Sequence, residues 1–459
     1  MNTQLPLTIK DTKEGLLTKK FSAVELVDEY LARINKNKDL NAFLTISDDL
    51  AYAKAKSIDS NLENLPLSGV ITAHKDLFLT KGVRTTASSK VLEDFVPEYS
   101  ATAVTKMEKA GAIMIGKTNC DAWAHGASGE NSDFGPTLNP WNKEYVPGGS
   151  SSGSATSVAA GLSLVATGTD TGGSIREPAN FCGVVGFKPT YGVVSRYGVI
   201  AMASSLDTVG SFGHTVEDVE AIFNVTKGPD GFDSTVANYQ PRATDHKLKI
   251  GIPEEYFIKG LDKEVEESVL EASKVFEKDG VELVPVSLPN TKYAIDVYYI
   301  VQPAEVSSNL GRYDGIRYGQ GRETFGAEAK RRIMLGTYVL SAGYYDAFYL
   351  KAQKVRSLLI QDFDKVFEKV DAIISPVTST PAFKLGEKAM DPLQMYLADI
   401  FTVSANLVGI PGLAVPSGFT KNNLPLGFQL MGPRFSEDTL FKLGKLYQKA
   451  VNYVPKTAI

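Results

Sequence analysis

The stretch PGGSSSGS at residues 147–154, followed by GTDTGGSIR at residues 168–176, decides how this chain is interpreted. By composition alone, residues 147–154 resemble a flexible Gly/Ser linker. They lead directly, however, into Ala155–Gly161, which predicts a small-residue helix closed by glycine, and then into Leu162–Ala166, which predicts a strand. A phosphate-binding loop is disfavoured because residues 153–155 lack the Walker lysine. The two segments are therefore expected to belong to a packed α/β core.

The segment at 168–176 predicts a nucleophile together with an oxyanion site. Glycine adopts conformations that a Cβ would forbid, so the backbone N–H groups of Thr171, Gly172, Gly173 and Ser174 can converge on one oxygen. Ser174 is then the expected nucleophile of a hydrolytic reaction, and it requires a base.

The four histidines do not supply that base convincingly, because none has the setting of a Ser-His-Asp triad. We expect His214 and His246 to be solvated surface residues. We expect His74 and His125 to be packed or hydrogen-bonded structural residues.

Lys75 is the better candidate base. It follows the β-branched and apolar run 70–74, which predicts a buried strand, and burial lowers the pKa of a lysine by disfavouring the ammonium form. A lysine at this distance from the nucleophile needs a relay, and Ser150 in the first glycine-rich segment is the candidate.

Lys75, Ser150 and Ser174, set in these two segments, give the chain a resemblance to the amidase signature family. In that family a lysine, a serine preceding an unusual cis peptide bond, and a nucleophilic serine form the catalytic set. The resemblance implies an α/β fold in which helices cover both faces of a large mixed β-sheet. Ser152 stands where the family usually has glycine, a departure that leaves the three catalytic positions intact.

Segments outside the signature resemble one branch of the family, the A subunits of glutamyl-tRNA(Gln) amidotransferases. The matching segments are 116–119, 130–132, 134–137 and 139–141 upstream, and 307–310, 312–319, 330–337 and 341–347 downstream. The resemblance implies that Arg332 holds the α-carboxylate of glutamine and Asp399 its α-ammonium group, a pairing that suits a zwitterion. It also places Ser128 and Tyr298 in the substrate site. Either charged residue alone would be interpreted as a surface arginine or a helix-capping aspartate.

Three departures from that branch concern the pocket. His125 and Gly129 replace the more usual methionine and threonine, and the stretch 319–329 is shorter than in relatives. We expect these changes to reshape the rim of the pocket or the coupling to partners and to leave the catalytic serines untouched.

Composition indicates an ordinary globular protein: 459 residues, 43% hydrophobic and 22% charged. The net charge of −5 argues that a partner holds most of any bound tRNA. Two cysteines without a secretory segment disfavour a disulfide scaffold, and no apolar run is long enough to cross a bilayer. We therefore expect a cytoplasmic protein that does not contact a membrane.

The order of predicted elements favours one amidase domain over residues 1–459, with the signature core at about 65–210 and the glutamine-recognition segments at about 298–402. Ser22 and Glu25 form a capping box before a helix. A second helix is predicted over 262–278 and a strand over 281–286. The polar stretch 227–246 is the best linker candidate, and we interpret it as a surface excursion.

These features favour a glutaminase that works through a Ser174 acyl-enzyme. By resemblance, the ammonia would pass to two partner chains, the B and C subunits of this branch, where ATP and Mg²⁺ serve the amidation of Glu-tRNA(Gln). The tRNA would be bound mainly by the partner, and this chain itself is expected to hold no metal or cofactor. The alternatives are a free-standing amidase acting on a small amide and a scaffold subunit without catalytic activity. The use of Asp-tRNA(Asn) is left open.

Overall fold

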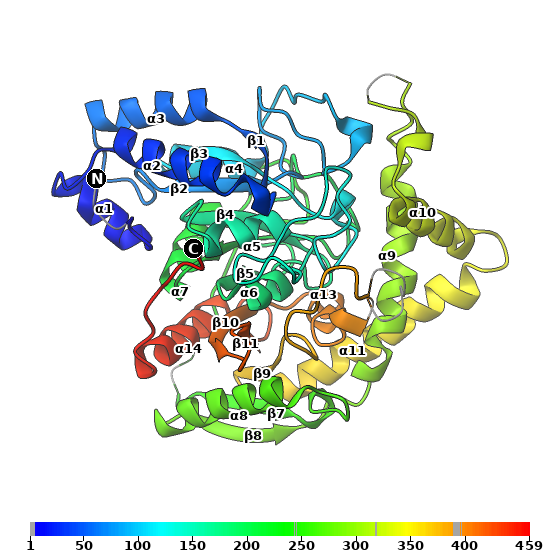
Figure 1. Cartoon of the computed structure of the whole chain (residues 1–459). Helices are drawn as coiled ribbons and strands as arrows, with labels where there is room; N and C mark the ends of the chain where they lie inside the picture. Colours follow the sequence, from blue (N-terminus) through cyan, green and yellow to red (C-terminus); the bar gives the residue numbers. More distant parts are fainter. Residues whose placement is uncertain (1–4, 243, 245, 317–318, 389–394, 396) are drawn as a thin grey trace.

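Eleven strands form one mixed sheet in the part of the chain that the computed structural model describes, residues 5–242, 244, 246–316, 319–388, 395 and 397–459 (Figure 1). Parallel pairing joins β2 to β3 and β4, and joins β7 to β8 and β9, while the other neighbouring pairs are antiparallel. In sheet order the strands are β1 (Phe43–Ile46), β3 (Ile113–Thr118), β2 (Ile71–Lys75), β4 (Val165–Asp170), β6 (Thr208–Gly213), β5 (Val185–Lys188), β10 (Gly412–Phe419), β11 (Pro425–Met431), β9 (Ala372–Pro376), β7 (Lys249–Pro253) and β8 (Glu282–Val286).

Helices surround this sheet along the whole chain. They are α1 (Ile9–Leu17), α2 (Ala23–Lys36), α3 (Asp48–Ser60), α4 (Thr102–Lys109), α5 (Ser152–Ala159), α6 (Arg176–Cys182), α7 (Val216–Thr226), α8 (Lys263–Lys278), α9 (Ala294–Leu310), α10 (Ala327–Leu340), α11 (Lys351–Phe367), α13 (Val403–Val408) and α14 (Glu437–Ala450).

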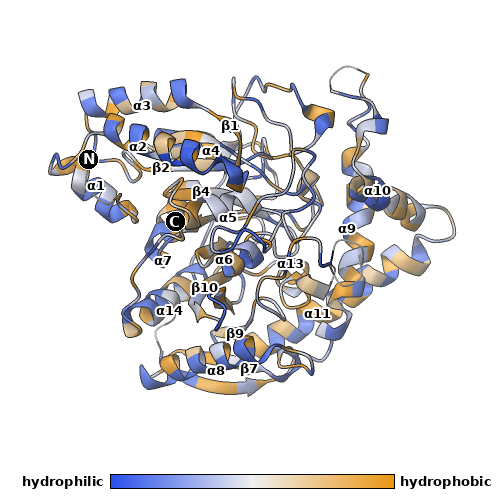
Figure 2. Cartoon of the chain, in the orientation of Figure 1, coloured by the Kyte–Doolittle hydropathy of each residue, from blue (hydrophilic) through white to orange (hydrophobic). Residues whose placement is uncertain are grey.

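Both faces of the sheet are covered, as strand β9 illustrates. Ala372 and Ile374 pack in a hydrophobic cluster with α7, α8 and α14, whereas Ile373 packs in a different cluster with α9, α11 and α13. Successive side chains of a strand point to opposite faces, so these two clusters lie on opposite sides of the sheet. Figure 2 shows the hydrophobic residues gathered on the strands and on stripes of the helices. The predicted fold class is confirmed.

Most of the local predictions are also confirmed. Ser22 and Glu25 form a capping box at the start of α2, Asp262 caps α8, and β8 covers the strand predicted at 281–286. The element after the first glycine-rich segment differs: α5 begins at Ser152, and β4 begins only at Val165. The intervening residues form a turn because the N–H groups of Leu162 and Ser163 bond to the Ser157 carbonyl at the end of α5.

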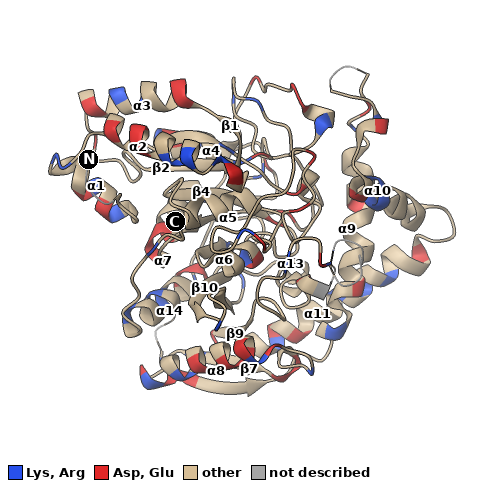
Figure 3. Cartoon of the chain, in the orientation of Figure 1, with Lys and Arg blue, Asp and Glu red and all other residues tan. Residues whose placement is uncertain are grey.

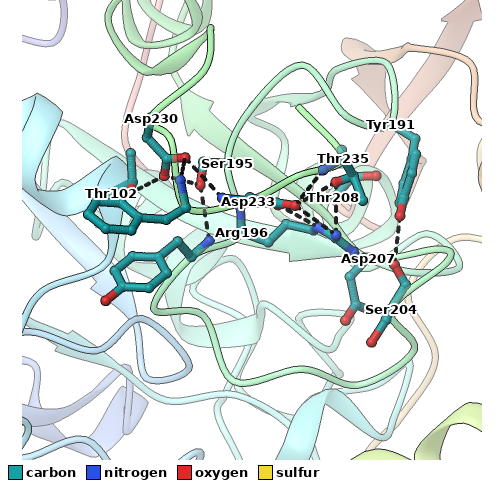
Figure 4. A network of polar contacts seen from close by, with 12 residues as sticks. Thr102, Tyr191, Ser195, Arg196, Ser204, Asp207, Thr208, Asp230, Asp233 and Thr235 are labelled. Carbon is teal, nitrogen blue, oxygen red and sulfur yellow. Dashed lines mark hydrogen bonds and ion pairs between the residues drawn. The ribbon is translucent and has the colours of Figure 1, made fainter. Parts of the chain in front are cut away.

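Residues 230–235 of the polar stretch are held against the signature core by the network in Figure 4. Arg196 pairs with Asp233 through two hydrogen bonds, 3.0 Å and 3.2 Å long. Asp230 accepts hydrogen bonds from Ser195 and Thr102. These contacts agree with a surface excursion, and the single-domain organisation remains a prediction.

Charged groups of both signs are spread over the outer helices, and Figure 3 shows Lys and Arg interspersed with Asp and Glu on α3 and α8. No helix among the described residues is long and apolar enough to span a membrane. The described residues also contain no group of three or more His, Cys, Asp or Glu side chains placed to hold a metal ion.

Candidate active site

Lys75 is the last residue of β2, in the interior of the sheet, and it is fully buried. Its amine lies 2.7 Å from Ser150 Oγ, 3.0 Å from Ser151 Oγ and 2.8 Å from Thr169 Oγ1. Burial lowers the pKa of Lys75 to about 8, although nearby acidic groups limit the shift. The structure thus places the predicted base against the predicted relay.

The three hydroxyl groups can orient the lone pair of a neutral lysine. A neutral amine has two N–H donors and one lone pair. Ser151 Oγ donates its own proton to the Thr169 carbonyl at 3.2 Å, so its oxygen is left to accept from Lys75. With Thr169 Oγ1 as the second acceptor, the lone pair of the amine faces Ser150. Ser151 and Thr169 are thus positioning residues that sequence reasoning missed, although both lie inside the two glycine-rich segments.

The first glycine-rich segment places Ser150 beside the nucleophile segment. The peptide bond between Gly149 and Ser150 is cis, so the unusual bond precedes the serine instead of following it, which corrects the sequence-based expectation. The next residue, Ser151, donates its N–H to the Ser174 carbonyl at 3.3 Å. Ser174 is 8% exposed whereas Lys75 and Ser150 are fully buried, so the predicted nucleophile is the member of the predicted set that reaches the surface of the site.

Glycine is required in the oxyanion loop by close packing. A Cβ on Gly172 would lie 2.7 Å from the hydroxyl oxygen of Tyr298, and a Cβ on Gly173, whose φ is +141°, would lie 2.4 Å from Thr402 Oγ1. The Gly173 N–H donates to Asp170 Oδ1 at 2.9 Å, which removes it from the predicted set of four oxyanion donors. The N–H groups of Thr171, Gly172 and Ser174 donate to no acceptor in the described residues.

Asp170 fixes this loop, and the sequence alone suggested no role for it. Its carboxylate accepts two hydrogen bonds from Arg176, both 3.1 Å long, as well as those from the Gly173 and Ile175 N–H groups. Asp170 and Arg176 are fully buried. In the sequence, Asp170 and Arg176 flank the loop, and this pairing of opposite charges was the signal that could have predicted their ion pair. A second brace is Asp207, which accepts from Thr171 Oγ1 at 2.7 Å and appears beside Arg196 in Figure 4.

Arg332 and Asp399, far apart in sequence, are linked by Tyr299. The Arg332 guanidinium lies 5.5 Å from the centre of the Tyr299 ring, and the Tyr299 hydroxyl donates to Asp399 Oδ2 at 3.0 Å. Arg332 also donates to Glu328 Oε1 at 2.8 Å and to Gln302 Oε1 at 2.9 Å. Burial raises the pKa of Asp399 to about 7, although the Tyr299 hydrogen bond acts in the opposite direction. Both residues are buried, so neither is a surface group.

The recognition residues are connected to the catalytic loop. Thr402 Oγ1 contacts both the Gly172 carbonyl, at 2.5 Å, and the Asp399 carbonyl, at 3.1 Å. The ring of Tyr298 lies 5.0 Å from that of Tyr299 and packs on Gly172. Of the predicted substrate residues, Tyr298 thus packs directly on the oxyanion loop, and Asp399 is connected to it through Thr402.

A cavity of about 240 Å³ opens beside Arg332. The predicted substrate residue Ser128 lines it, as does Tyr299, which sequence reasoning missed although it follows Tyr298 directly. The remaining lining residues are His125, Gly126, Ala127, Glu130, Asn131, Ala327, Glu328, Arg331, Lys388 and Met395. Because Ala327 and Glu328 belong to the shortened 319–329 stretch, that stretch forms part of the pocket wall.

Gly129 and Ser152, the two positions expected to depart from the branch, pack against each other. A Cβ on Gly129, whose φ is +84°, would lie 2.6 Å from the Cβ of Ser152. The space that a threonine side chain would need is therefore occupied by the serine that replaces glycine. Ser152 Oγ donates to Thr137 Oγ1 at 3.1 Å, which directs this hydroxyl away from the proton path.

The histidines lie outside the proton path. His74 is buried and its Nδ1 lies 3.2 Å from Thr167 Oγ1, and His246 is exposed beside Asp371. His214 was expected at the surface, and this prediction is wrong: it is 1% exposed. It directly follows β6 and precedes Thr215, whose side chain caps α7, so the chain is still inside the core at this point.

The amidase family model matches residues 25–441, which is most of the chain. The chain belongs to the amidase signature family. The fold agrees with that assignment, and so does the joint occurrence of a buried lysine at the end of β2, its contact with Ser150 and a glycine-rich loop before Ser174.

Similar proteins of this family lie in the branch that the downstream segments predicted. The A subunit of the glutamyl-tRNA(Gln) amidotransferase of Koribacter versatilis is 52% identical over 97% of this chain and 98% of the relative. The corresponding protein of Carboxydothermus hydrogenoformans is 50% identical over 97% of this chain and 98% of its own length. The crystal structure of the A subunit from Thermotoga maritima superposes with a TM-score of 0.82 at 39% identity, covering 97% of this chain and 96% of that one. This amidase thus belongs to the branch of the amidotransferase A subunits.

Proposed function

We propose that this chain is the glutamine-hydrolysing component of a tRNA-dependent amidotransferase, the A subunit of an enzyme that converts Glu-tRNA(Gln) to Gln-tRNA(Gln). The observation that carries the proposal is the combination of a buried Lys75–Ser150 contact with Arg332 and Asp399, two buried charged residues that Tyr299 links. The first pair supplies hydrolysis of an amide, and the second supplies charges for the two ends of an amino acid.

In the proposed reaction, neutral Lys75 takes a proton from Ser150 as Ser150 takes one from Ser174. Ser174 Oγ bonds to the side-chain amide carbon of glutamine, and the C=O electron pair moves onto the oxygen. The N–H groups of Thr171, Gly172 and Ser174 stabilise this oxyanion, each donor contributing on the order of 10²–10³ in rate. The relay returns a proton to the nitrogen, and the C–N bond breaks to release ammonia.

Water completes the cycle. It loses a proton through the same relay, attacks the acyl carbon, and releases glutamate while Ser174 regains its proton. The ammonia would then be used by partner subunits, with ATP and Mg²⁺ acting there, where most of the contact with tRNA would also be made. We place this reaction in the cytoplasm.

The proposed function is tested by comparing glutamine with an uncharged amide in variants that lack Arg332 or Asp399. Arg332→Ala and Asp399→Ala are each expected to lower kcat/KM for glutamine by a factor of about 30 or more, the scale of a lost charge-assisted contact. Hydrolysis of a neutral amide such as propionamide is expected to change much less, because Lys75, Ser150 and Ser174 remain. Equal losses on both substrates would indicate structural damage. No loss on glutamine would favour a free-standing amidase.

A further inference from the structure

His125 is buried in the wall of the recognition cavity, and neither of its ring nitrogens is paired with another described residue. It follows a short turn at Ala122–Ala124 and is 0% exposed. Its backbone carbonyl accepts a hydrogen bond from Asn131 Nδ2 at 2.6 Å. The residue lines the same cavity as Arg332, Ser128 and Glu328.

Leaving a buried imidazole unpaired is unfavourable, since it loses its hydrogen bonds to water and gains none in return. Burial and the nearby Arg332 guanidinium lower the pKa of His125 well below its usual value. The imidazole is therefore neutral and offers one N–H donor. A ligand in the cavity that His125 lines can supply the missing partner.

The surroundings of Arg332 favour an anionic ligand group. Gln302 Oε1 accepts from Arg332, and because a guanidinium only donates, the amide oxygen of Gln302 has to face it. This orientation leaves Gln302 Nε2 buried without a partner among the described residues. A second unpaired donor therefore adjoins Arg332. Glu328 and Glu130 also line the cavity: Glu328 is paired with Arg332, and Glu130 Oε1 accepts from the Gly386 N–H, while Glu130 Oε2 has no partner among the described residues.

We propose that His125 is a specificity-determining residue whose ring N–H donates to the substrate α-carboxylate held by Arg332. The inference rests on the proposed function and refines it. Arg332 supplies the charge, and His125 supplies a directed hydrogen bond that an amide without the carboxylate cannot accept.

The test compares His125→Met with wild-type enzyme, purified with the subunits that accompany it, on three substrates: glutamine, glutaminamide and propionamide. Glutaminamide keeps the α-ammonium group and lacks the α-carboxylate. We expect His125→Met to raise the KM for glutamine roughly 10-fold, the scale of one hydrogen bond to a charged group, with a much smaller change in kcat. The KM for glutaminamide is expected to change by less than about 2-fold.

The Tm of His125→Met, measured with and without glutamine, gives a second result that a purely structural role of His125 would not produce. Replacing an unpaired buried polar group with an apolar one should preserve or raise the Tm of free His125→Met, while its stabilisation by added glutamine falls. His214→Met is the matched control, because His214 Nε2 is also buried without a partner among the described residues, and His214 lies away from the cavity lining. We expect this control to leave the KM for glutamine unchanged.

The outcomes separate this inference from the proposed function. An equal rise of KM for glutamine and glutaminamide in His125→Met, or no rise for glutamine, would overturn the role of His125. If wild-type enzyme showed no preference for glutamine over propionamide, the proposed function itself would fail. If Arg332→Ala impaired glutamine use and His125→Met did not, only the role of His125 would be rejected.

Discussion

The proton relay around Lys75 and the cavity beside Arg332 differ in whether their polar groups are paired. Around Lys75, three hydroxyls contact the amine, and Asp170 braces the oxyanion loop through at least four hydrogen bonds. Around Arg332, His125 and Gln302 keep buried polar atoms that pair with no described residue. The difference teaches that a proton relay needs geometry fixed before the substrate arrives, whereas the Arg332 cavity, like the oxyanion N–H groups, leaves polar groups for the substrate to satisfy.

The largest effect on activity is expected when the predicted nucleophile is removed from the catalytic centre. Ser174→Ala should lower glutamate release by on the order of 10³-fold or more, and adding Lys75→Ala and Ser150→Ala should cost little further, because the three act as one unit. Initial rates and Tm are the measurements. Ser152→Ala is the control, since its hydroxyl bonds to Thr137. Substantial turnover by folded Ser174→Ala would refute the assignment.

The pH dependence of the reaction tests the same centre without a mutation, because it depends on the protonation state of Lys75. Its pKa is lowered to about 8 by burial, and only the amine that has lost its proton can act as a base. We therefore expect kcat/KM for propionamide to rise as the pH increases through about 8 and then to level off. A neutral amide avoids the titration of Asp399. A pH-independent rate, with chemistry shown to be limiting, would contradict a neutral lysine base.

A smaller effect should come from disturbing how Lys75 is oriented. Thr169→Val removes one acceptor of the amine and should lower kcat by roughly 10-fold to 100-fold, the scale of one hydrogen bond to a reacting group. Thr167→Val, two residues away on the same strand, is the matched control because its hydroxyl contacts His74. Equal losses in the two variants would show that strand packing, not lysine orientation, is responsible.

The smallest effect concerns the recognition pocket. The pKa of Asp399 is raised to about 7 by burial, and only its ionised form attracts the α-ammonium group. The KM for glutamine should therefore fall as the pH rises through this value, by up to about 10-fold over the two surrounding pH units. Asp399→Asn should abolish this dependence. Its persistence in that variant would assign the titration to another group.

Predictions from the sequence were most successful for structural features that depend on residues close together in the chain. The capping box at Ser22, the helix after Asp262 and the buried strand ending at Lys75 depend on neighbouring residues, so short-range patterns predicted them. The prediction that His214 is exposed failed for the converse reason. Its polar sequence neighbours suggested exposure, but one of them, Thr215, caps a helix that packs back on the sheet.

The sequence by itself determined the family, the fold class and the segments that carry Lys75, Ser150 and Ser174, because these depend on residue types in a fixed order. Only the tertiary structure decided which donors remain available, since the Gly173 N–H is used by Asp170. It also decided that Gly129 makes room for Ser152, and that His125 lines the Arg332 cavity with both ring nitrogens lacking a partner among the described residues. These features depend on contacts between segments whose spacing along the chain does not specify their distance in space.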